Sequence, residues 1–124
     1  MEIPFCKLLG MQLESAAEGT SQCTLTVREA HFNPHHCVHG GVLYALADTG
    51  MGAALYSRLA PDEYCATIEI KMSYFKVVHD GVLRCTSRVI KHGKRIACLE
   101  SELFNQDVLV AKASGSFSIL KRDL

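Results

Sequence analysis

Apolar and polar residues alternate with a period of two through most of the second half of the chain. Successive side chains of a strand point to opposite faces of a sheet, so this alternation predicts strands. The alternating stretches are 66–74, 83–89, 97–103 and 109–119. Asp80-Gly81 and Asn105-Gln106-Asp107 supply turns between them, and His92-Gly93-Lys94 has the composition of a hairpin tip. Because the connections are short, we expect consecutive strands to pair antiparallel.

The first thirty residues follow the same rule after a short N-terminal turn. Leu25 and Val27 alternate with polar neighbours, and Glu18-Gly19 marks a turn before them, so two further strands are expected. Residues 31–39 are rich in histidine and contain the breaker Asn33-Pro34, which predicts a loop.

One segment, Gly41–Arg58, breaks the alternation and is predicted to be the only substantial helix. It lacks proline, and Leu43, Ala47 and Ala54 recur at helical spacing. The segment is apolar on nearly every side, and a helix of that kind is covered by other structure. The whole pattern predicts an α+β hotdog fold, in which five or six antiparallel strands wrap one long buried central helix.

Composition narrows the class of protein. The chain has 124 residues, which suits a single domain over 1–124. Thirteen Lys and Arg balance thirteen Asp and Glu, so there is no basic footprint for a nucleic acid. The N-terminus lacks a basic start followed by an apolar run, and the apolar stretch 42–56 is too short for a bilayer. The six cysteines form no Cys-x-x-Cys pair. We therefore expect a cytoplasmic protein with reduced thiols and no membrane contact.

Asp48 is the only charged residue between Gly41 and Ser57. A carboxylate in apolar surroundings needs hydrogen bonds, a partner charge or a proton in compensation. Such an acid can have a structural role, in which it bonds a backbone amide or a neighbouring strand, or it can take part in a reaction. The run His39-Gly40-Gly41 lies just upstream, where glycine lets a ligand approach the backbone and a helix start offers free N–H groups. This combination favours a chemical role.

The run from His39 to Gly52 resembles the HGG…D signature of hotdog acyl-CoA thioesterases of the phenylacetic-acid-degradation (PaaI-like) type. The likeness covers nearly the whole chain and includes Asn33, the strand Ala66–Tyr74 and the stretch Val89–Arg95. It implies hydrolysis of a CoA thioester without a metal or redox cofactor, coenzyme A being part of the substrate. It also implies a homodimer with active sites at the interface, and often a homotetramer. The acyl group stays open between aromatic and medium-chain.

The resemblance also assigns roles to single residues. Asp48 matches the general base or nucleophile, and the Gly40 N–H matches the donor that polarises the thioester carbonyl. Asn33 matches the residue that places the thioester, and Thr67 matches the one that orients water. The substrate-binding set is His39, Gly41, Lys91, His92, Gly93, Lys94 and Arg95. His39 is expected to bond the backbone and hold the turn. The cationic tip 91–95 is either a contact for coenzyme A phosphates or a solvated hairpin turn.

Spacing along the helix adds a constraint. Gly40 and Asp48 are eight positions apart, which is about 12 Å at ~1.5 Å per residue. One reacting carbon needs both groups within about 3–4 Å. A single helix therefore cannot present both to the same carbon. We expect the Gly40 end of one chain to meet Asp48 of another, with two equivalent sites in a twofold dimer.

The position of Thr67 depends on the regularity of its strand. In a regular strand Thr67 points away from the face shared by Ala66, Ile68 and Ile70. If that face packs on the helix, Thr67 reaches an active site only through a bulge or on a face that meets a dimer partner.

Two other functions stay open on the residues alone. A hotdog dehydratase of 3-hydroxyacyl thioesters would pair a loop histidine with a helix acid, and His31 is the candidate. A non-catalytic acyl-CoA binding module would hold its ligand without turnover. A zinc site among His31, His35, His36 and His39 is disfavoured, because the nearby proline and glycines oppose a helix and no carboxylate completes the set.

Overall fold

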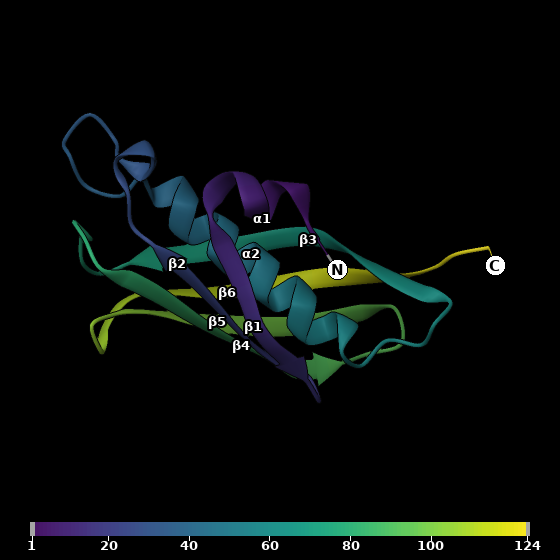
Figure 1. The fold of residues 1–124 in the computed structure, drawn as a ribbon. Helices are drawn as coiled ribbons and strands as arrows, with labels where there is room; N and C mark the ends of the chain where they lie inside the picture. Colours follow the sequence, from purple (N-terminus) through teal and green to yellow (C-terminus); the bar gives the residue numbers. More distant parts are fainter. Residues whose placement is uncertain (1, 124) are drawn as a thin grey trace.

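The computed structural model describes residues 2–123 and has one long helix lying across a six-stranded antiparallel sheet (Figure 1). This arrangement confirms the hotdog architecture that the alternation predicts. The elements are α1 (Pro4–Leu9), β1 (Met11–Ala17), β2 (Thr20–Thr26), the 3-10 helix η1 (Glu29–His31), α2 (Gly40–Tyr56), β3 (Glu63–Tyr74), β4 (Val82–His92), β5 (Ile96–Asn105) and β6 (Val108–Lys121).

The strands follow the order β1-β2-β4-β5-β6-β3 across the sheet. Short turns join β4 to β5 and β5 to β6, and each of these pairs is antiparallel. The strand β3 follows α2 in the chain and lies at the far edge of the sheet, where it pairs with β6. The helix α2 and the edge strand β3 are therefore consecutive in sequence and adjacent in space.

The N-terminal segment differs from the expected turn, because it forms the six-residue helix α1. Pro4 stands in its first turn, where the fixed φ of proline suits a helix and the missing N–H would have had no partner. Gly10 ends the helix with a φ of 82°, a left-handed conformation that glycine adopts without strain.

The core forms where one side of α2 meets the sheet. The buried residues of the helix are Val42, Leu43, Leu46, Ala47, Gly50, Met51, Ala54 and Leu55. Their partners on the strands include Leu25, Leu83, Leu99, Leu103 and Phe117. Full burial of one such large side chain contributes about 1.5–3 kcal/mol. This packing anchors the helix, and it sets the position of Asp48 with it.

The opposite side of α2 is only partly covered by its own chain. Gly41, Tyr44, Asp48, Gly52 and Tyr56 recur every three or four residues on this side and are half-buried or exposed. We call these five residues the open stripe. The sheet thus wraps one face of the helix and leaves this stripe partly uncovered in a single chain.

None of the helices within residues 2–123 is long and apolar enough to cross a membrane. The six cysteines are free thiols.

Candidate active site

The start of α2 is organised by two side chains, His39 and Tyr74. His39 is the N-cap residue, and its Nδ1 accepts a hydrogen bond from the Gly41 N–H at 2.8 Å. The Tyr74 hydroxyl donates to the Gly40 carbonyl oxygen at 2.7 Å. The Gly40 N–H has no acceptor within residues 2–123. A free donor therefore stands at the positive end of the helix dipole, where it can polarise a carbonyl.

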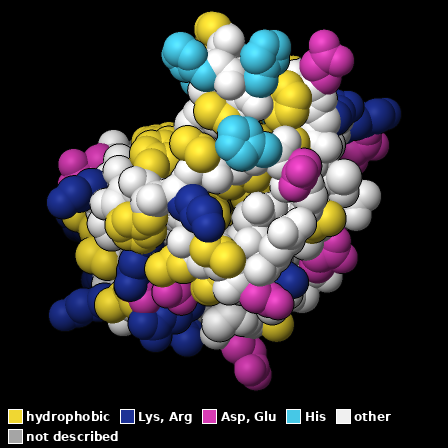
Figure 2. Space-filling view, turned by 90° about the vertical axis from the view of Figure 1, so that its left-hand side faces the viewer, with side chains coloured by type: hydrophobic (Ala, Val, Ile, Leu, Met, Phe, Trp, Pro, Cys, Tyr) yellow, Lys and Arg dark blue, Asp and Glu magenta, His cyan; other side chains and the backbone are white. Residues whose placement is uncertain are grey.

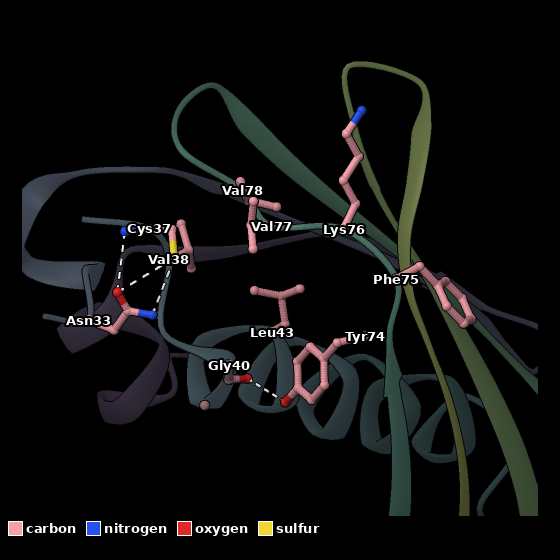
Figure 3. A pocket seen from close by; sticks show the side chains of 11 residues that line it. Asn33, Cys37, Val38, Gly40, Leu43, Tyr74, Phe75, Lys76, Val77 and Val78 are labelled. Atoms are coloured by element: carbon pink, nitrogen blue, oxygen red, sulfur yellow. Dashed lines mark hydrogen bonds between the residues drawn. The ribbon is translucent and has the colours of Figure 1, made fainter. Parts of the chain in front are cut away.

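A cleft of about 430 Å³ opens beside this turn. Its walls come from the loop before α2, the first helical turn, and the end of β3 with the segment that follows it (Figure 3). Val38, Leu43, Val77 and Val78 supply apolar surface, and the ring of Tyr74 lies beside Gly40 with its hydroxyl pointing at the Gly40 carbonyl oxygen. A concave, mostly apolar wall with a few polar groups is typical of a small-molecule site.

Asn33 lies on the wall of this cleft and organises the loop before α2. Its Oδ1 accepts from the N–H groups of His35 at 2.8 Å and of Cys37 at 3.3 Å. Its Nδ2 donates to the Cys37 sulfur at 3.3 Å. The side chain thus has a structural task in the single chain. Its amide borders the cleft close to the Gly40 turn (Figure 3).

Asp48 stands half-buried on the open stripe and has a partner on β3. The Thr67 hydroxyl donates to Asp48 Oδ1 at 2.7 Å. A bulge makes this contact possible, because the register of β3 against β6 shifts between Thr67 and Glu69. The expected common face of Ala66, Ile68 and Ile70 is therefore not formed against the helix, and Ile68 is 53% exposed.

The bulge changes which residues of β3 face the core. Cys65 packs against the core before the bulge, and Ile70 and Met72 pack against it afterwards. One extra residue shifts the parity of inward-facing positions from odd to even numbers. Strict alternation along the sequence misplaces Thr67 for this reason.

Cys65 is the second neighbour of the acid. Burial raises the pKa of the Cys65 thiol to about 11, and the nearby Asp48 charge adds to the effect. The thiol is therefore protonated near neutral pH. On its β3 side Asp48 thus lies beside a neutral sulfhydryl and a hydroxyl. Within residues 2–123 no Lys, Arg or His forms a salt bridge with Asp48.

The predicted site residues fall into two groups within one chain. The Gly40 half-site consists of Asn33 and Gly40, which share the cleft. The Asp48 half-site consists of Asp48 and Thr67, which are hydrogen-bonded to each other and do not line that cleft.

The substrate-binding set is also divided. His39 and Gly41 belong to the Gly40 turn, whereas the tip 91–95 joins β4 to β5 and carries exposed cations. Thr67 pairs with Phe117 on β6, which pairs with Ala97 on β5. Two strand spacings, about 10 Å, therefore separate the Asp48 half-site from the strand that leaves the tip.

The loop histidine His31 is buried and hydrogen-bonded to the backbone. His31 is 2% exposed, its Nδ1 accepts from the Arg28 N–H at 3.0 Å, and its Nε2 lies 2.7 Å from the Leu9 carbonyl oxygen. Both ring nitrogens thus have backbone partners, one of them in the N-terminal segment, and His31 is not free to act as the loop base of a dehydratase. Figure 2 shows histidines gathered at one end of the molecule beside apolar side chains. Within residues 2–123 no three potential ligands converge on a metal position.

Two residues of the cleft were missed by sequence reasoning. Tyr74 is the last residue of an alternating strand. Its contact with Gly40 depends on where β3 passes the start of α2, which no local sequence pattern predicts. Cys37 stands four positions after Asn33 in the histidine-rich loop, and that spacing is the one signal that could have suggested their contact.

Comparison with known proteins agrees with this geometry. Residues 35–112 match the Thioesterase superfamily family model. The chain is 34% identical to acyl-coenzyme A thioesterase PaaI of Escherichia coli K12 over 101 residues, which are 81% of this chain and 70% of that protein. A conserved protein of Pseudomonas aeruginosa superposes with a TM-score of 0.93 at 34% identity, covering 97% of this chain and 96% of the other.

A variant of phenylacetic acid degradation protein PaaI from Thermus thermophilus superposes with a TM-score of 0.87 at 26% identity, covering 94% of this chain and 98% of the other. The chain therefore belongs to the thioesterase superfamily, as a PaaI-like thioester hydrolase with the hotdog fold.

Proposed function

We propose that this protein hydrolyses acyl-CoA thioesters, with Asp48 as general base or nucleophile and the Gly40 N–H as the donor to the carbonyl oxygen. The observation that carries the proposal is the Thr67–Asp48 hydrogen bond on the open stripe, on the same helix whose first N–H is free. A carboxylate, a hydroxyl and a backbone donor are the groups that thioester hydrolysis requires.

The chemistry assigns each group a task. Attack on the thioester carbonyl puts negative charge on its oxygen, which the Gly40 N–H and the helix dipole stabilise. Asp48 takes a proton from water or attacks the carbonyl itself. Thr67 donates to one carboxylate oxygen of Asp48, which leaves the second oxygen for the reacting water or carbon. Asn33 positions the thioester from the wall of the cleft.

Two subunits complete each site in this proposal. Gly40 and Asp48 are eight residues apart on α2. The two half-sites of one chain are therefore too far apart to act on the same carbon. The open stripe and the edge strand β3 are the surfaces over which a second copy can bring its Asp48 half-site to this Gly40 half-site. A homodimer with two shared sites follows, and paired dimers would give a tetramer.

The substrate is divided between two surfaces. The apolar cleft takes the acyl group, and a volume of about 430 Å³ suits an aromatic or medium-chain acyl. Lys91, His92, Lys94 and Arg95 at the exposed tip bind the phosphates of coenzyme A. Hydrolysis by these residues requires no metal or redox cofactor, and the free thiols favour a cytoplasmic setting.

A thiol-release assay with aromatic, short and long acyl-CoA substrates tests the reaction, and Asp48→Asn tests the acid. We expect Asp48→Asn to lower kcat by at least a hundredfold while the fold, followed by circular dichroism, is unchanged. Asp62→Asn is the matched control, because Asp62 is a surface acid paired with Lys121. Wild-type turnover by Asp48→Asn would refute the mechanism. Tight acyl-CoA binding without thiol release by the wild-type protein would indicate a binding module.

Gly40→Pro and Gly40→Ala test the donor. His39 has a φ of −59° and a ψ of 135°, which a residue before proline favours. Proline is also common at the first position of a helix. Gly40→Pro therefore removes the N–H and Gly40→Ala keeps it, while both variants add the same Cβ beside the Tyr74 ring. We expect Gly40→Pro to lower kcat about a hundredfold relative to Gly40→Ala. Equal rates for the two variants would exclude this donor.

A further inference from the structure

We propose that Tyr74 is a positioning residue for this reaction: it holds the Gly40–Gly41 peptide and so orients the Gly40 N–H of the adjoining peptide towards the thioester carbonyl. The inference rests on the proposed function, in which that N–H is the donor. Tyr74 has no counterpart among the residues to which the resemblance assigns a role.

The hydrogen bonds around Gly40 carry the argument. The peptide group between Gly40 and Gly41 is held at both polar ends, because Tyr74 donates to its oxygen at 2.7 Å and His39 accepts its N–H at 2.8 Å. The preceding peptide is held through the His39 oxygen, which accepts from the Val42 N–H at 2.9 Å. The Gly40 N–H is the one polar group of these two peptides with no partner within residues 2–123.

Tyr74 differs from the other partners in where it comes from. His39 and Val42 belong to the same helical turn as Gly40, and the first turn of a helix frays readily. Glycine adds to this freedom because its backbone is the least restricted. Tyr74 belongs to the end of β3, 34 residues further along the chain. Its hydroxyl therefore ties the peptide that follows the donor to the sheet.

Close packing supports the same assignment. A Cβ atom added at Gly40 would lie 3.2 Å from Cζ and from the hydroxyl oxygen of Tyr74, closer than ordinary van der Waals contact. Glycine at position 40 therefore lets the Tyr74 ring lie against the helix start without displacement (Figure 3). Burial raises the pKa of Tyr74, with the neighbouring Tyr44 as a second cause, so the hydroxyl is a donor throughout the neutral range.

The strand β3 therefore contacts both half-sites. Thr67 donates to Asp48 and Tyr74 donates to the Gly40 carbonyl. The two contacts are seven residues apart on one strand, so β3 holds both the acid and the peptide next to the donor on the same helix. A change at Tyr74 should then alter the donor without disturbing the acid.

Tyr74→Phe tests the inference, because it keeps the ring and removes the hydroxyl. We expect kcat to fall three- to tenfold with KM within twofold of wild type, since the lost bond orients a group that acts mainly in the transition state. Tyr64→Phe is the matched control on the same strand, where Arg122 stacks on the ring at 5.5 Å and phenylalanine preserves that contact. Wild-type kcat in Tyr74→Phe, or a rise in KM with kcat unchanged, would overturn the proposal.

A double-mutant cycle separates positioning from a general loss of packing. If Tyr74 acts through the Gly40 N–H, Tyr74→Phe should lower the rate of Gly40→Ala but not the residual rate of Gly40→Pro, which carries the same Cβ. Multiplicative losses would show that Tyr74 acts independently and would reject the inference. If Gly40→Pro itself matches Gly40→Ala, the donor assignment fails instead, so failure of the proposed function is distinguishable from failure of this inference.

Discussion

Thr67 owes its contact with Asp48 to one extra residue in β3. The shift in register between Thr67 and Glu69 turns the hydroxyl towards the helix and the Ile68 side chain outwards. Hydrogen bonds to a charged group are worth about 1.5–3 kcal/mol. The geometry of this single position therefore gives the carboxylate of Asp48 its hydrogen-bond donor.

Replacing Thr67 with valine keeps the shape of the side chain and removes the hydroxyl. We expect Thr67→Val to lower kcat about ten- to a hundredfold, because the carboxylate of Asp48 loses its donor. Thr67→Ser, which retains the hydroxyl, should stay within about threefold of wild type. Thiol-release kinetics for the two variants provide the measurement, and equal kcat values for valine and serine would argue against a role for the hydroxyl.

The thiols should differ in reactivity at mildly alkaline pH. Burial raises the pKa of Cys23 to about 12 and that of Cys65 to about 11, so both are protonated at pH 8 and poor nucleophiles. Cys98 is exposed. Iodoacetamide treatment of the folded protein followed by peptide mass mapping should therefore modify Cys98 well before Cys23 or Cys65. Faster labelling of Cys23 than of Cys98 would contradict the buried placement of β2.

At the scale of elements, α2 rests on hydroxyl groups in the core. The Ser21 hydroxyl donates to the Gly50 carbonyl oxygen, and the hydroxyls of Ser87 and Ser101 are hydrogen-bonded to each other at 2.6 Å. All three serines are buried and partnered, so their polarity carries little desolvation penalty. Gly50 lies two residues after Asp48, and this contact therefore seats the turn that carries the acid.

Gly50→Ala should destabilise the fold by about 1–3 kcal/mol, because the new Cβ would lie 2.5 Å from the Ser87 hydroxyl oxygen. Removing that oxygen as well should relieve the crowding. We expect Gly50→Ala/Ser87→Ala to be more stable than the sum of the two single changes predicts. Urea denaturation of the three variants measures this coupling. Strictly additive losses would mean that Ser87 is not what requires glycine at position 50.

For the whole molecule, the decisive feature is the separation of the two half-sites on one helix. The Asp48 half-site lies on the open stripe, and the Gly40 half-site lies at the helix start beside the cleft. The side chains of Tyr44 and Tyr56 are exposed on this side of the single chain. A second copy would cover them while completing the chemistry.

Hybrid dimers test the shared site directly. Asp48→Ala and Gly40→Pro homodimers should both be nearly inactive, because each has two damaged sites. A hybrid of the two chains combines both defects in one site and leaves the other intact. Co-expression in equal amounts should therefore restore about 25% of wild-type activity, since about half of the dimers are hybrids. No recovery in tag-purified hybrids would place each complete site within one subunit.

Association itself is measurable without activity. Sedimentation equilibrium at micromolar concentration should give a mass of at least twice the 13.6 kDa of one chain. Ile68→Lys places a charge on the exposed bulge of the edge strand and should shift the mass towards that of one chain. A monomeric wild-type protein with full thiol-release activity would contradict the dimer proposal.

Most of the fold was predictable from local pattern. Alternation over 66–74 and 109–119 located β3 and β6, and the apolar run after His39 located α2 within two residues at either end. These features follow from the period of two in strands and of 3.6 in helices, which covalent geometry imposes wherever a stretch is half-buried. The short helix α1 was missed because six residues span too few turns for a helical period to emerge.

The sequence alone determined the strands, the helix, the antiparallel connections, and the pairing of an isolated acid with a glycine turn eight residues earlier. Tertiary structure alone decided that Thr67 faces Asp48, that Tyr74 meets Gly40, and that one side of α2 is left open. The reason is physical. Periodicity is a property of neighbours in the chain, whereas a bulge, a crossing strand and an uncovered face depend on how distant segments meet.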